Sequence, residues 1–327
     1  MTKSPFFKYA LFAVKAGITI GLIWLVLRNV NMTDTLARVR SIPPLIAIVG
    51  VLLMLLLSFF CIIRWQIVMR QFGQMLSLRI TTRLFFEGLF FNQALPSTVG
   101  GDGVRIYRAF RAGLPLAAAI NGVVLDRVLG LSSLMILAAL AQPLFYQRVD
   151  SIAARLSFTA VFVLAVSGIL VLLLLGFMPA WFRQWKLARG LVSLSQAARR
   201  AYATPRVFFP VTLLSVAGHL ISVMVFYLLA VGLNLGVSFL DCLVMVPSVL
   251  LLATVPISVA GWGVREGATV AAFGLLGVPP GGAAAASVLF GLGMAITALP
   301  GGLLWFLNAD REMGEVGPLP AEGSNGD

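Results

Sequence analysis

The chain alternates between long apolar stretches and short polar segments, and six of the apolar stretches are long enough to cross a membrane. A membrane-spanning helix needs about 20 predominantly apolar residues. The six stretches cover residues 9–27, 45–65, 116–141, 156–177, 207–233 and 283–307. The pattern predicts an all-α polytopic membrane protein with about six full spans.

Two further apolar stretches, residues 84–95 and 242–255, are too short to cross. Each leads into a segment that contains proline and clustered glycine. Proline lacks a backbone donor and glycine favours irregular backbone, so both interrupt a helix. We expect each short stretch to be one arm of a broken, re-entrant helical hairpin.

The two glycine-rich segments form an internal repeat. Pro96-Ser-Thr-Val-Gly-Gly-Asp-Gly-Val-Arg105 aligns without gaps with Pro256-Ile-Ser-Val-Ala-Gly-Trp-Gly-Val-Arg265. Proline, valine, two glycines, valine and arginine recur at the same offsets. The repeat predicts two related halves, about residues 45–141 and 207–308.

Composition supports this architecture. The chain of 327 residues is 60% hydrophobic and 11% charged, with a mean hydropathy of +0.99. Its formal net charge of +12 does not indicate a nucleic-acid partner, because membrane proteins collect basic residues in cytoplasmic loops. Residues 1–308 are predicted to form one transmembrane domain, and residues 309–327 a disordered acidic tail.

The distribution of Lys and Arg predicts the orientation. The N-terminal segment, the 64–83 segment and the 179–206 loop are richer in basic residues than the other connecting loops. Those other loops cover residues 28–44, 142–155 and 232–241. By the positive-inside rule both termini lie in the cytoplasm, and the two halves are inverted copies. Within the 179–206 loop, an interfacial helix and a plain solvated loop are both compatible with the sequence.

The first glycine-rich segment has the chemistry of an anion site. Asp102 is placed to cap a helix, with Arg105, Arg108 and Arg111 following at intervals of three on one broad face. Glycines 100, 101 and 103 let backbone N–H groups converge, and a helix N-terminus adds about half a positive charge. In a membrane the anion is often a phosphate headgroup. Alternatively, the glycines permit tight helix crossing and Asp102 merely pairs with an arginine.

The second segment differs at two positions. Trp262 replaces the aspartate, and Glu266 directly follows Arg265. An arginine at membrane depth is a candidate functional residue whose expected partner is a carboxylate, here Glu266, Asp102 or Asp126.

Two acidic residues elsewhere have simpler interpretations as well. Asp126 and Arg127, inside a predicted span, form a local structural pair or line a polar cavity. Glu87 is expected to pair with Arg83, four residues earlier.

Residue types for catalysis or metal binding are scarce. The single His219 lies in an apolar stretch without a second His or a carboxylate nearby, and Cys61 and Cys242 lack metal-ligand spacing. We expect no enzymatic activity, no cofactor and no metal.

Three motifs occur together in the chain: Asn92-Gln-x-x-Pro-Ser-x-x-Gly-Gly-Asp-Gly-x-Arg105, Asp126-Arg127-x-x-Gly130, and Pro256-x-Ser-x-Ala-Gly-Trp-Gly-x-Arg-Glu266. With these motifs the chain resembles the lysylphosphatidylglycerol synthase transmembrane-region family over about residues 8–308. Members of this family are flippase-like integral membrane proteins. In members fused to a cytosolic aminoacyl-transferase domain, the membrane part is associated with moving aminoacylated lipid between leaflets. We expect no such domain here, so the resemblance does not imply lysyl transfer.

The resemblance implies a lipid-translocation role carried by the motif residues. These are Pro96, Gly100, Gly101, Asp102, Arg105, Asp126, Arg127, Gly261, Gly263, Arg265 and Glu266. The candidate substrate-binding site also takes in their polar or aromatic neighbours Asn92, Ser97, Gly103, Arg108 and Trp262.

The leading functional hypothesis is translocation of an amphiphilic lipid between leaflets of a bacterial cytoplasmic (inner) membrane. The substrate is expected to be a phospholipid, a hopanoid-type lipid or a polyprenyl-linked lipid, held at a polar site near the membrane midplane. The alternative is a non-transporting accessory or scaffold subunit for an envelope-lipid biosynthetic enzyme. Membrane lipids are the expected partners, together with a second copy of the chain or such an enzyme. A lipid-modifying enzyme is the least favoured class.

Overall fold

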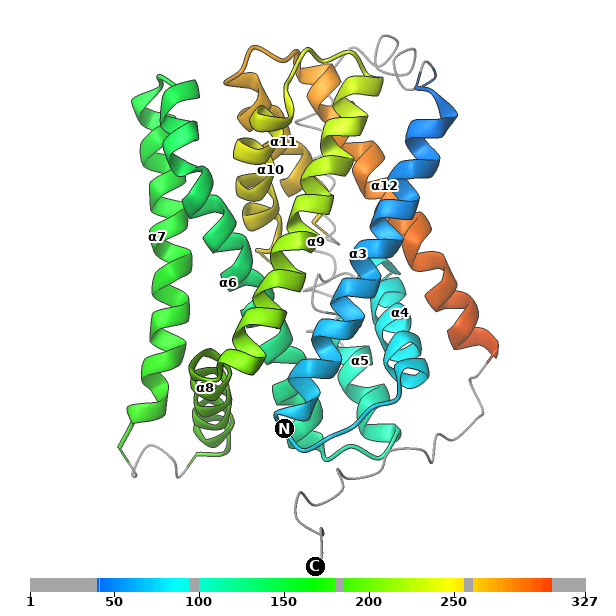
Figure 1. The fold of residues 1–327 in the computed structure, drawn as a ribbon, viewed down its shortest axis with the longest axis vertical. Helices are drawn as coiled ribbons and strands as arrows, with labels where there is room; N and C mark the ends of the chain where they lie inside the picture. Colours follow the sequence, from blue (N-terminus) through cyan, green and yellow to red (C-terminus); the bar gives the residue numbers. More distant parts are fainter. Residues whose placement is uncertain (1–39, 41, 95–99, 180–184, 256–260, 308–327) are drawn as a thin grey trace, which may run out of the picture.

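The computed structural model describes residue 40 and residues 42–94, 100–179, 185–255 and 261–307. Over these residues the fold is all-α, with one 3-10 turn and no strand (Figure 1). The predicted first span at 9–27, the tail at 309–327 and the candidate site residues Pro96 and Ser97 lie outside the described residues.

Five helices are long and apolar enough to cross a membrane, and they confirm five of the six predicted spans. They are α3 (Pro44–Arg70), α6 (Leu116–Arg148), α7 (Ile152–Leu174, extended to Phe177 by the 3-10 turn η1), α9 (Pro205–Gly232) and α12 (Pro280–Leu307). Three of these helices, α3, α9 and α12, begin at a proline, whose missing N–H is not needed in the first turn.

Two pairs of shorter helices lie on either side of the two copies of the repeated motif or include their described ends. They are α4 (Leu78–Ala94) with α5 (Gly100–Arg111), and α10 (Phe239–Ala253) with α11 (Val264–Gly274). The α4–α5 pair lies in the lower half of the view and the α10–α11 pair in the upper half (Figure 1). Because the long helices run between these two ends, the two pairs enter the bundle from opposite sides. This placement is the one an inverted repeat requires, although membrane re-entry and the repeat itself stay predictions.

Close helix crossings fix the α4–α5 hairpin in the bundle. A Cβ atom at Gly101 of α5 would overlap the Gly88 carbonyl oxygen of α4, and one at Gly301 of α12 would overlap the Phe86 carbonyl. Small residues at such crossings let membrane helices approach closely. Helix α4 is therefore held between α5 and α12, and α12 also contacts α3, α9 and α11.

Helices α7 and α8 (Lys186–Ala203) form the edge of the molecule at the left of Figure 1. No residue of α7 is buried. Helix α8 occupies most of the 179–206 segment and buries an apolar face that includes Ala188, Val192 and Ala198, while Arg199 and Arg200 are exposed. This face packs on other helices, including α6, α7 and α9, so it is covered by protein.

Candidate functional site

Asp126 is the centre of a buried ionic network that joins three helices. Arg64 Nε of α3 donates to Asp126 Oδ1 at 2.8 Å, and Arg105 Nη2 of α5 donates to Asp126 Oδ2 at 3.1 Å. All three side chains are buried. Isolated buried charges are strongly unfavourable. Asp126 therefore offsets the buried charge of each arginine, and at least one arginine is required to offset the charge of Asp126.

Asp102 extends this network on α5. Its Oδ2 accepts from Arg127 Nε at 2.7 Å, and its Oδ1 lies 3.9 Å from Arg105 Nη1. The expectation that Asp102 caps the helix is wrong, because α5 already includes Gly100 and Asp102 lies within its first turn. Asp126 and Arg127 do not pair with each other either, because Asp126 binds Arg64 and Arg105 whereas Arg127 binds Asp102.

Glu87 of α4 forms a second buried cluster with two arginines. It accepts two hydrogen bonds from Arg108, at 2.8 Å from Nε and 3.1 Å from Nη2, and one from Arg83 Nε at 2.9 Å. The Arg83 contact agrees with the sequence-based expectation, whereas the bidentate Arg108 contact was not anticipated. Arg108 also lies over the Trp305 ring, 5.0 Å from its centroid.

Together these contacts form an arginine-rich network near the first hairpin. Among the described residues five arginines are linked to three carboxylates; three of these arginines are buried, whereas Arg83 is partly buried and Arg127 is exposed. The linked residues are Arg64, Arg83, Arg105, Arg108 and Arg127 with Glu87, Asp102 and Asp126.

Two buried donors beside this network have no hydrogen-bond partner in the part of the chain that the structure describes. They are Arg105 Nε and Trp65 Nε1. The two side chains are stacked, with Arg105 Cζ 3.9 Å from the Trp65 ring centroid. Buried donors normally have acceptors. These two N–H groups can therefore donate hydrogen bonds to an additional oxygen atom.

The glycines of the first motif have different surroundings. Gly101 donates its N–H to Asn92 Oδ1 at 2.9 Å and lies in the crossing with Gly88, as the tight-crossing interpretation expects. In contrast, Gly103 is exposed, and a Cβ atom there would meet nothing within 4 Å. Gly100, the first described residue of α5, is partly buried. The side chain of Asn92 therefore occupies one donor at this end of α5.

The second hairpin forms a compact, neutral cluster. Arg265 Nη2 donates to Glu266 Oε1 at 2.6 Å, and Ser287 of α12 contacts both residues, at 3.2 Å from Arg265 Nε and 3.1 Å from Glu266 Oε1. The other carboxylate oxygen, Oε2, accepts from the backbone N–H of Gly263 at 2.5 Å. The partner expected for Arg265, a nearby carboxylate, is thus Glu266.

Small and aromatic residues shape this second cluster. Gly261 and Gly263 have φ values of +79° and +83°, which favour glycine. Trp262 lies 4.8 Å from Arg265 Cζ, measured to its ring centroid. Gly291 of α12 leaves room for the arginine, because a Cβ atom there would overlap the guanidinium.

The structure holds the predicted residues as two separate sets. Among the described residues, no hydrogen bond or ion pair joins Arg105 or Asp102 to Arg265 or Glu266. Helices α6 and α12 contact both hairpins and so connect the two sets through the bundle. In the same part of the chain, no three His, Cys, Asp or Glu side chains are grouped to hold a metal ion.

Sequence reasoning missed three residues of these clusters. Arg64 was assigned to a cytoplasmic basic segment, yet it is buried within α3. Its position inside an otherwise apolar stretch is a signal that indicates a buried partner. For Trp65 and Ser287, nothing in the local sequence predicts their contacts.

Comparison with known proteins supports the resemblance seen in the motifs. The model of a family described as lysylphosphatidylglycerol synthase TM region matches residues 12–302. No curated protein matches the chain. The family match spans both hairpins, four of the five described long helices and α12 as far as residue 302.

Proposed function

The chain belongs to the lysylphosphatidylglycerol synthase transmembrane-region family, and we propose that it moves an amphiphilic lipid between the leaflets of a bacterial cytoplasmic membrane. The headgroup enters the polar region of the two hairpins while the tail stays in the surrounding lipid. Phospholipids, hopanoid-type lipids and polyprenyl-linked lipids are the candidate substrates.

The observation that carries this proposal is the cluster of buried arginines at the first hairpin, one of which has a donor without an acceptor among the described residues. Charged groups within membrane helices are costly and tend to mark substrate or ion pathways. Here Arg64, Arg105 and Arg108 are buried beside three carboxylates, and the Nε donor of Arg105 has no acceptor among the described residues. A phosphate-bearing headgroup supplies both negative charge and acceptor oxygens, so it complements this network.

The proposed movement has no need of nucleotide hydrolysis. It is passive, or coupled to an ion or proton through Asp102, Asp126 or Glu266. A phosphate that reaches Arg105 competes with Asp102 and Asp126 for the same guanidinium. A carboxylate released from its arginine gains affinity for a proton, and this exchange provides a physical basis for coupling.

The proposed orientation places both termini in the cytoplasm. The end of the bundle that carries the α3–α4, α5–α6 and α7–α8 connections is shown at the bottom of Figure 1. It includes α8 with the exposed arginines Arg189, Arg199 and Arg200. Among the described residues, the opposite end, with the α6–α7 and α9–α10 connections, has fewer basic residues, which supports placing it outside.

The test is lipid translocation by purified variants in proteoliposomes. We expect Arg105→Ala and Arg265→Ala to slow the transfer of fluorescently labelled phosphatidylglycerol relative to wild type. Arg200→Ala, which removes an exposed arginine of α8, is the matched control and is expected to leave the rate unchanged. If the two hairpin variants fold and move lipid at the wild-type rate, the proposed site is wrong.

The exposed helix α7 favours the accessory or scaffold function as a second candidate. None of its residues is buried, so the face of α7 that does not pack on α6 and α8 is open to a partner protein or a second copy of the chain. This alternative predicts a stable partner on co-purification and no lipid transfer by the purified protein alone.

A further inference from the structure

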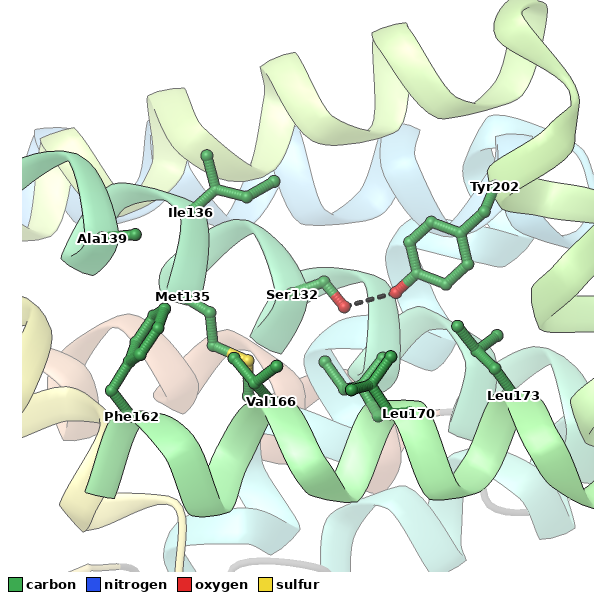
Figure 2. Close-up of a pocket in the computed structure, with 10 residues that line it drawn as sticks. Ser132, Met135, Ile136, Ala139, Phe162, Val166, Leu170, Leu173 and Tyr202 are labelled. Carbon is green, nitrogen blue, oxygen red and sulfur yellow. Dashed lines mark hydrogen bonds between the residues drawn. The ribbon is translucent and has the colours of Figure 1, made fainter. Parts of the chain in front are cut away.

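An apolar crevice lies between α6 and α7 and is bounded at one end by α8. It has a volume of about 260 Å³. Figure 2 shows the Met135 side chain of α6 reaching toward Val166 of α7, with Leu170 further along α7. Among the described lining residues, the only side-chain oxygens are the Ser132 and Tyr202 hydroxyls, which are hydrogen-bonded to each other (Figure 2). The crevice is therefore apolar along its length.

The position of the crevice points to an acyl chain as its occupant. Both α6 and α7 are membrane-spanning candidates, and α7 has no buried residue, so the crevice adjoins the hydrocarbon of the membrane. An unfilled apolar groove forfeits dispersion contacts along its walls. A flexible acyl chain can fill an irregular groove without leaving any polar group unsatisfied.

Positive charge lies at the α8 end of the same crevice. Arg199 precedes the lining residue Tyr202 by three positions on α8, which is about one helical turn. The Arg199 guanidinium stacks on Phe177, with Cζ 3.9 Å from the ring centroid. Phe177 follows Leu173, another lining residue, by four positions. Arg199, which is exposed, is thus about one turn from the apolar lining.

We propose that this crevice binds one acyl chain of an anionic phospholipid whose phosphate contacts Arg199. The combination of an apolar groove with an arginine at its end matches the two parts of such a lipid, and anionic headgroups attract basic residues at the membrane surface. The site contains no residue of either hairpin, so it does not depend on the proposed translocation. The proposal assigns a lipid-binding role to α7 and α8.

Native mass spectrometry of the purified protein tests the site with an equimolar mixture of palmitoyl-oleoyl phosphatidylglycerol and phosphatidylcholine. Leu170→Trp fills the crevice, and Leu164→Trp places the same substitution at an exposed α7 position outside the lining. Arg199→Gln removes the proposed phosphate contact, and Arg189→Gln removes another exposed arginine of α8.

We expect the wild type to retain phosphatidylglycerol in preference to phosphatidylcholine. Leu170→Trp loses retained lipid of both kinds, whereas Leu164→Trp behaves as wild type. Arg199→Gln lowers the preference for phosphatidylglycerol by about fivefold, as expected for one surface arginine, and Arg189→Gln preserves it. Equal retention by the two Trp variants, or equal preference in the two Gln variants, overturns the proposal. A wild-type dimer that Leu170→Trp converts to monomer also overturns it, because the occupant is then a second copy.

A measurement on the wild type keeps the proposal testable if a variant does not fold. Phosphatidylglycerol with a photoreactive diazirine on its acyl chain is crosslinked to the protein in nanodiscs, and the labelled peptides are mapped. Labelling of Met135, Val166 or their neighbours in the lining supports the site. Labelling confined to other helices overturns it.

Discussion

Arg105 of α5 and Asp126 of α6 form a buried ion pair, with Nη2 3.1 Å from Oδ2. Asp126 shares its other oxygen with Arg64 of α3, at 2.8 Å from Nε. One carboxylate therefore holds three helices together at the first hairpin. Any anion that binds Arg105 has to compete with this carboxylate. The pair therefore bears on both the stability of the fold and the proposed function.

Replacing Asp126 with Asn should strongly destabilise the fold. The substitution leaves Arg64 and Arg105 buried, and Arg64 loses the carboxylate on which it depends. Removing one partner of a buried ion pair typically costs about 3–5 kcal/mol. Thermal unfolding in detergent measures the effect. Asp150→Asn is the control, because Asp150 is fully exposed, so its change should be small. Equal melting temperatures for the two variants contradict this role of Asp126.

Alanine substitutions at two glycines of α5 should have opposite effects. Gly101→Ala places a methyl group onto the Gly88 carbonyl and should destabilise the hairpin by about 1–3 kcal/mol or more, as overpacking does. Gly103→Ala meets open space in the same helix and should be neutral or stabilising by up to about 1 kcal/mol. Urea or thermal unfolding of the two variants distinguishes them. A stable Gly101→Ala protein refutes the tight crossing.

The second hairpin allows a similar comparison around Arg265. Gly291→Ala in α12 pushes into the guanidinium, so we expect lower stability and a weakened Arg265–Glu266–Ser287 cluster. Gly274→Ala, at a position where a Cβ atom meets nothing within 4 Å, is the matched control. Comparing melting temperatures provides the measurement. Identical melting temperatures for the two variants contradict the close contact between Gly291 and the Arg265 guanidinium.

Cysteine labelling tests the proposed orientation. Met75, between α3 and α4, and Asp150, between α6 and α7, lie in exposed connections at opposite ends of the bundle. In a background of Cys61→Ala and Cys242→Ala, a membrane-impermeant maleimide should label Asp150→Cys in intact spheroplasts. Met75→Cys should react only after permeabilisation. The opposite result reverses the orientation, and labelling of both from one side rejects the topology.

The long helices were predictable from the sequence because apolar run length is a local property. Residues 45–65, for example, became α3, Pro44–Arg70. The start of α4 was missed, since Arg79 and Arg83 make the segment from Leu78 look like a loop. Within this helix, Glu87 is paired with Arg108 from the next helix, and that contact is absent from any local pattern.

The composition of the site was only partly predictable for the same reason. The motifs pointed to Asp102, Arg105 and Asp126, but Arg64 and Asp126 are 62 positions apart in sequence. Charge alone does not say which arginine pairs with which carboxylate. The packing of α3, α5 and α6 decides this, and it determines that Arg105 is shared by two aspartates.

The central claim is that the purified protein itself moves lipid between leaflets, and the direct measurement is a dithionite-quenching assay. Proteoliposomes contain labelled phosphatidylglycerol and the wild-type protein, and are assayed with and without a proton gradient. The proposal predicts that the inner-leaflet label becomes accessible faster than in protein-free liposomes, and that Arg105→Ala slows this exchange. A wild-type protein that leaves the label as protected as in protein-free liposomes, under both conditions, contradicts the proposal and favours the accessory function.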